Sequence, residues 1–179
     1  VDLDLDGLII VGGTISNGDA ASLAEEFIKR NLKTKVIGVP CNIDGDLKNR
    51  HVETAVGFDS ATKVYSSLIG HLSTDAASAR KYYYFIRVMG RAPSHIALEC
   101  SMQSKPNLTF VSEEVEMKKQ SLTDIVCDIA DLVEQRSEEG KNFGVVVIPE
   151  GTGCQSFLMT LFFIFRFSWK SVNFIHKQK

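Results

Sequence analysis

The sequence has few of the features that mark a secreted, metal-dependent or nucleic-acid-binding protein. Its four cysteines include no CxxC pair and its four histidines are isolated from one another, so no metal cluster of these residues is predicted. The net charge is only −2, which argues against nucleic acid or an anionic membrane as the main partner. The first residues lack a signal-peptide pattern, and together with the cysteines this predicts reduced thiols and a cytoplasmic location.

The sequence also lacks an apolar run that could span a bilayer. The run 157–167 is interrupted by Arg166 and is shorter than the roughly 20 residues required. Residues 152–179 hold six of the eleven phenylalanines and four basic residues but no acidic one. This break predicts that 152–179 lies outside the evolved domain and comes from a misread gene; a surface-lying membrane anchor is the alternative.

What is present indicates one α/β domain with a parallel sheet flanked by helices, because short apolar runs alternate with helical segments. Ser121 followed by Asp124 predicts a helix start. The chain enters its first strand abruptly, which predicts that strands of the same sheet precede it and that the domain, residues 1–151, is partial. The expected strands are 6–11, 35–39, 82–89, 108–111 and 143–148, and the expected helices include 20–30 and 123–138.

Two predicted strands end in residues suited to phosphate chemistry. Gly12 and Gly13 follow the first strand and precede a helix, where backbone N–H groups can approach a phosphate. Asp44 and Asp46 follow the second strand, where a carboxylate can act as a general base or hold a cation through water. Each pattern has a structural alternative: ordinary turn chemistry for the glycines, and an Asx-type turn for the aspartates.

Two further strand ends carry charged groups. Gly90 and Arg91 follow the strand 82–89, and the arginine fork suits a phosphate or a transferring phosphoryl group, although a solvated strand-end residue fits equally. Glu150 follows the last strand and can accept hydrogen bonds from sugar hydroxyls or cap a helix.

Taken together and in order, these segments resemble the pyrophosphate-dependent phosphofructokinases over residues 1 to about 151. The matching segments are the glycine loop at 12–16, the turn at 40–47, the strand at 81–91 and the strand end at 149–151, with further likeness at 57–63 and 94–100. The resemblance implies a phosphofructokinase-like, Rossmann-like three-layer fold, and transfer of a phosphoryl group from pyrophosphate to fructose 6-phosphate with Mg²⁺. It also implies an oligomer, because Lys81 and Tyr82 match positions offered to a neighbouring subunit.

The resemblance assigns roles to individual residues. Asp44 matches the proton acceptor, Asp46 the second acid of the turn, and Gly12 and Gly13 the pyrophosphate loop. Asp44, Asp46 and Arg91 form the implied catalytic set. The implied substrate-binding residues are Ile43, Asp44, Lys81, Tyr82, Met89, Gly90, Arg91 and Glu150.

Two departures from the family pattern argue against activity. Catalytic members carry two aspartates where this chain has Thr14 and Ile15, so the metal position is lost; they also carry Lys-Thr where it has Cys41 and Asn42. The loop is similar to that of the plant-type regulatory alpha subunit, yet Asp44 is retained. The sequence therefore leaves three functions open: a regulatory subunit partnering a catalytic beta-type chain or itself, an active phosphotransferase, and a truncated product without function.

Overall fold

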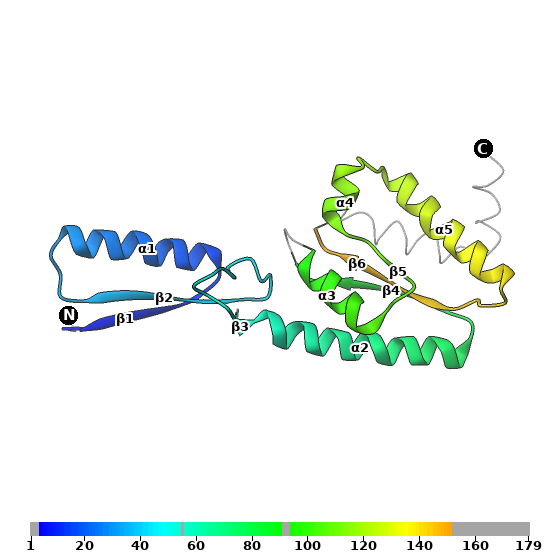
Figure 1. Ribbon diagram of the computed structural model, residues 1–179, viewed down its shortest axis with the longest axis horizontal. Helices are drawn as coiled ribbons and strands as arrows, with labels where there is room; N and C mark the ends of the chain where they lie inside the picture. Colours follow the sequence, from blue (N-terminus) through cyan, green and yellow to red (C-terminus); the bar gives the residue numbers. More distant parts are fainter. Residues whose placement is uncertain (1–3, 55, 91–93, 152–179) are drawn as a thin grey trace. The chain divides into compact units, whose positions relative to one another are not determined.

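The structure is a computed structural model that describes residues 4–54, 56–90 and 94–151. The chain forms two compact units, residues 1–63 and 64–179, each with a three-stranded sheet. The strand pairs within both sheets are parallel, as expected, and the predicted strands divide between the two. Figure 1 labels the helices and strands.

The first unit is a β-α-β segment extended by a short third strand. β1 pairs with β2 from Gly7 opposite Lys35 to Gly12 opposite Pro40, and β3 continues beside the end of β2. The two-residue strand β3 was not predicted, because two residues carry no recognisable alternation. The elements are β1 (Gly7–Gly12), α1 (Thr14–Lys29), β2 (Lys35–Asn42) and β3 (Val56–Gly57).

The helix α1 begins at Thr14, six residues before the predicted start at Ala20. The prediction was wrong here because Asn17 and Gly18 are poor helix formers. In the structure the Asn17 side-chain amide donates hydrogen bonds to the carbonyl oxygens of Gly12 at 2.6 Å and Gly13 at 2.9 Å. The first turn of α1 is thereby tied to the glycine pair.

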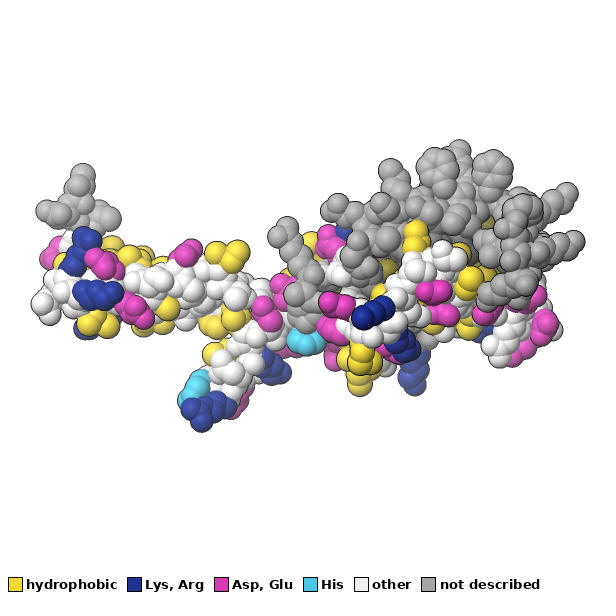
Figure 2. Space-filling view, turned by 90° about the horizontal axis from the view of Figure 1, so that it is seen from above, with side chains coloured by type: hydrophobic (Ala, Val, Ile, Leu, Met, Phe, Trp, Pro, Cys, Tyr) yellow, Lys and Arg dark blue, Asp and Glu magenta, His cyan; other side chains and the backbone are white. Residues whose placement is uncertain are grey.

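One face of the first sheet is apolar and exposed. Exposure alternates along β1, with Ile9 and Val11 more than 60% exposed, and Ile9 lies in register with the exposed Ile37 of β2. Figure 2 shows hydrophobic side chains at the surface of this part, among charges of both signs. Across the described stretches of the chain, none of the helices is long and apolar enough to cross a membrane.

The second unit has the strand order β4-β6-β5, and all pairs are parallel. Every residue of β6 is buried, as expected for the central strand of a sheet covered on both faces. Figure 1 shows α4 and α5 on one side of this sheet and α3 on the other. The elements are α2 (Phe58–Ala79), which runs in from the first unit, β4 (Tyr83–Val88), α3 (His95–Ser104), β5 (Leu108–Thr109), α4 (Ser112–Met117), α5 (Leu122–Glu138) and β6 (Gly144–Pro149).

The core of the second unit lies between α5 and β6. Apolar residues recur on α5 at helical spacing and pack against alternate residues of β6. The predicted helix start is confirmed: the Asp124 N–H donates to Ser121 Oγ at 3.3 Å and the Ser121 N–H donates to Asp124 Oδ2 at 2.8 Å, which is a capping box. The core residues are Phe110, Val115, Ile125, Ile129, Val133, Val146 and Ile148.

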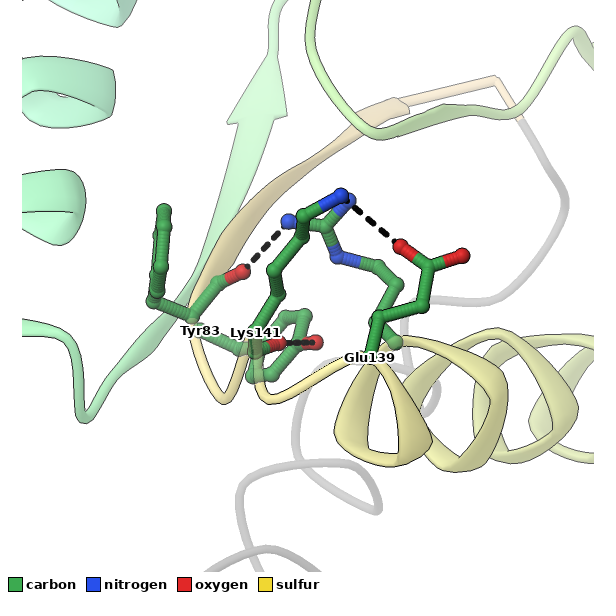
Figure 3. A network of polar contacts seen from close by, with 5 residues as sticks. Tyr83, Glu139 and Lys141 are labelled. Carbon is green, nitrogen blue, oxygen red and sulfur yellow. Dashed lines mark hydrogen bonds and ion pairs between the residues drawn. The ribbon is translucent and has the colours of Figure 1, made fainter.

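A polar network fixes the turn between α5 and β6 (Figure 3). The Tyr83 hydroxyl donates to the Lys141 carbonyl oxygen at 3.2 Å, and Lys141 Nζ lies 2.8 Å from Glu139 Oε2. A Cβ added at Gly144 would lie 2.7 Å from the Tyr83 ring. The tyrosine therefore packs directly over the start of β6, at the end of the strand opposite Glu150.

Candidate functional site

The glycine pair lies at the carboxyl end of β1, where the chain turns into α1. Gly13 occupies the N-cap position of α1, and within the described residues no side chain caps this end of the helix. A Cβ at Gly12 would lie 2.6 Å from the Ser16 side chain, so close packing requires glycine. A glycine loop lets the backbone come close to a ligand, and the first N–H groups of the helix have no side-chain cap. Such a loop is suited to bind an anion.

The acidic turn lies next to this loop, at the carboxyl end of β2. Asp44 is half-buried, Asp46 is exposed, and Gly45 between them has φ +71°, which favours glycine. The Thr14 hydroxyl donates to Asp46 Oδ2 at 2.8 Å, and the Asn42 amide donates to Asp46 Oδ1. The structure thus brings the predicted phosphate loop and the predicted acidic turn together.

These residues do not fit a magnesium site built by the protein. The two oxygens of Asp46 accept hydrogen bonds from a hydroxyl and an amide, and an amide N–H directed at the carboxylate opposes a cation there. No three His, Cys, Asp or Glu side chains are grouped to hold a metal ion in the part of the chain that the structure describes. Thr14 instead links the glycine loop to the acidic turn through its hydrogen bond to Asp46.

The second unit carries the other predicted residues at two different places. Met89, Gly90 and Glu150 follow the carboxyl ends of β4 and β6; Gly90 is buried with φ +134° and Met89 is 55% exposed. Lys81 and Tyr82 precede the amino end of β4 and are exposed. The six residues of β4, at about 3.3 Å each, therefore separate these two groups along the strand.

The remaining predicted site residues are Arg91, Ile43 and Asp44. Arg91 lies outside the described residues. Asp44 belongs to the first unit and Glu150 to the second, so their convergence on one sugar-phosphate pocket stays a prediction. Ile43 is half-buried in the acidic turn beside Asp44.

Two hydrogen bonds join Ser94, the N-cap residue of α3, to the first turn of α4. The Ser94 N–H donates to Glu113 Oε1 at 2.9 Å, and the Ser112 N–H donates to Ser94 Oγ at 2.8 Å. Burial acts to raise the pKa of Glu113, but hydrogen bonds from Ser94 and from the Glu113 backbone N–H, with the nearby His95, outweigh it, so that the pKa lies below its ordinary value. The sequence analysis missed this contact because the partners come from different helices.

Parallel α/β units with a glycine loop and acidic residues at their strand ends are typical of proteins that bind phosphorylated ligands. Comparison with known families matches residues 1–177 to Phosphofructokinase, and the chain belongs to this family. The predicted phosphofructokinase-like fold is confirmed by comparison with solved structures. The structure resembles that of the Pichia pastoris phosphofructokinase in the T-state, with a TM-score of 0.65 and 19% identity over 87% of this chain and 18% of that one.

The relatives confirm the pyrophosphate-dependent branch. The chain is 54% identical over 149 residues to the beta subunit of pyrophosphate–fructose 6-phosphate 1-phosphotransferase from Solanum tuberosum, covering 83% of this chain and 26% of that protein. It is 55% identical over 150 residues to subunit alpha 2 from Arabidopsis thaliana, covering 84% and 24%. The alpha type is consistent with these values, although the two identities are nearly equal. The chain spans about a quarter of the length of these curated relatives.

Proposed function

We propose that this chain acts as a regulatory, alpha-type part of a pyrophosphate-dependent phosphofructokinase, binding fructose 6-phosphate and partnering a catalytic chain. The observation that carries the proposal is that both carboxylate oxygens of Asp46 accept hydrogen bonds from neutral side chains. Thr14 and Asn42 stand at positions where the sequence departs from catalytic members, and both donate hydrogen bonds to this carboxylate. The acidic turn is therefore held by neutral donors.

The same residues argue for weak phosphoryl transfer. Thr14 and Ile15 replace the two aspartates of catalytic members, and Cys41 replaces the lysine expected to neutralise the transferring phosphoryl group. If the lost carboxylate beside the metal–phosphate complex and the lost lysine each cost about 3 kcal/mol of transition-state stabilisation, turnover falls roughly ten-thousandfold. Binding of phosphate and sugar depends less on the lost charges than phosphoryl transfer does, since Gly12 and Gly13 at the loop and Glu150 at the strand end are retained.

A second candidate function is an active phosphotransferase, and the retention of Asp44 favours it. In that reading Asp44 accepts the proton of the attacking sugar hydroxyl and Arg91 stabilises the charge that develops on the phosphoryl group. The implied Mg²⁺ would neutralise phosphate charge when bound with the substrates. This chain would offer it no carboxylate at position 14, where it has Thr14.

The test uses the purified 179-residue chain. Fructose 6-phosphate is expected to raise its melting temperature, and the shift should disappear in Arg91→Ala but persist in the control Arg30→Ala, an exposed arginine paired with Glu26. With pyrophosphate and Mg²⁺ added, no turnover is expected. Turnover abolished by Asp44→Asn would establish the active enzyme instead, and no shift at saturating ligand would exclude the binding role.

The link between Thr14 and Asp46 gives a separate prediction. Thr14→Asp places a second carboxylate against Asp46, so the melting temperature is expected to fall by about 3 °C, the equivalent of roughly 1 kcal/mol, without divalent cations. Millimolar Mg²⁺ should restore most of the loss by neutralising the pair, and should leave the wild-type value unchanged. Thr14→Asn is the neutral control. An equal Mg²⁺ response in wild type and variant would contradict the hydrogen-bonded arrangement.

A further inference from the structure

Arg87 forms an ion pair with Glu150 at the carboxyl edge of the second sheet. Arg87 Nη2 lies 2.7 Å from Glu150 Oε1; Arg87 lies in β4, and Glu150 directly follows the adjacent strand β6. The sequence analysis gave Arg87 no role, because in the sequence it is 63 residues from Glu150. Only the parallel pairing of the strands brings the two side chains together.

The strand register explains how the pair forms. Arg87 lies opposite Ile148, so Glu150, two residues after Ile148 and just past the end of β6, is on the same face of the sheet. The Glu150 N–H also donates to the Val88 carbonyl oxygen at 3.0 Å, which extends the ladder beyond the end of β6. The backbone of Glu150 is therefore held by β4, and its carboxylate is held by the arginine of the same strand.

The pair contributes little to stability by itself. The side chains of Arg87 and Glu150 are 41% and 34% exposed, and ion pairs at such sites are weak because water and salt screen them. Its main effect is on orientation. The arginine holds Oε1 of the carboxylate at the carboxyl edge of the sheet, which is the edge where ligands of parallel sheets bind.

We propose that Arg87 is a positioning residue that orients the Glu150 carboxylate to accept hydrogen bonds from hydroxyl groups of a sugar phosphate. The inference rests on the proposed binding of fructose 6-phosphate. Arg87 acts through Glu150 and does not contact the phosphate of the ligand. Removing Arg87 therefore leaves the carboxylate in place but free to rotate, which weakens sugar binding and spares the binding of phosphate alone.

The experiment measures dissociation constants by calorimetry for fructose 6-phosphate and, separately, inorganic phosphate. Arg87→Met is expected to weaken sugar-phosphate binding about tenfold. Arg87→Lys is expected to weaken it by a smaller factor, because lysine retains the positive charge but lacks the planar fork of arginine. In the Glu150→Gln background, Arg87→Met should have no further effect. Lys141→Met, which removes an exposed ion pair at the opposite end of β6, is the matched control.

The outcomes separate this inference from the proposed function. If wild type does not bind fructose 6-phosphate, the proposed function fails, and the inference with it. If wild type binds but Arg87→Met weakens binding equally in the Glu150→Gln background, or also weakens binding of inorganic phosphate, Arg87 contacts the ligand itself and only the positioning role is overturned. Should Arg87→Met lose its fold by circular dichroism, Arg87→Lys in both backgrounds decides the same question.

Discussion

Replacing Gly57 by alanine is expected to destabilise the first unit by about 3 kcal/mol. Gly57 has φ +110°, a backbone conformation that side chains with a Cβ rarely adopt. An added Cβ would also lie 2.8 Å from the carbonyl oxygen of Asn42, and a backbone atom cannot move away as a flexible side chain can. The two costs add, and both act where β3 closes on the end of β2.

The measurement is urea unfolding followed by circular dichroism, with Gly70→Ala as the control. Gly70 lies within α2 and an added Cβ would meet nothing within 4 Å. Alanine there should stabilise the helix by about 0.5–1 kcal/mol, because it restricts the unfolded chain and has the higher helix propensity. Substitutions of one chemical kind are thus expected to have opposite signs. Equal effects would contradict the close approach of Gly57 to Asn42.

The second large effect is expected from Ile129→Ala in the core of the other unit. Ile129 is fully buried between α5 and the sheet, so its truncation removes apolar contacts and leaves a cavity. The expected loss is about 3 kcal/mol in the free energy of unfolding. Val133 and Ile125, one turn away on either side, are held in the same cluster and cannot close the cavity without moving the helix.

Ile28→Ala supplies the matched comparison, since it is the same substitution in a helix at a residue that is 71% exposed. It is expected to change stability by no more than about 0.5 kcal/mol. Both variants are measured by denaturant unfolding. The midpoint is compared, and so is the slope of the unfolding free energy against denaturant concentration. A loss for Ile28→Ala as large as that for Ile129→Ala would mean that the α1 surface is buried in solution.

The short apolar runs identified the strands well, because alternation and β-branched residues report burial on a pleated sheet. All five predicted strands match strands of the structure, with ends that differ by no more than three residues. The start of α1 was less predictable, since Asn17 is a poor helix former whose value lies in its contacts with Gly12 and Gly13. The capping box at Ser121 was predictable because both partners lie within four residues.

The sequence by itself determined the family, the order of the strands and helices, and the residue types available for phosphate chemistry, since these depend on local pattern and motif. Only the tertiary structure decided that Thr14 and Asn42 both donate to Asp46, and that Arg87 pairs with Glu150. The physical reason is that strand pairing and register bring together residues far apart in the chain. Neither local propensity nor spacing encodes which strand lies beside which.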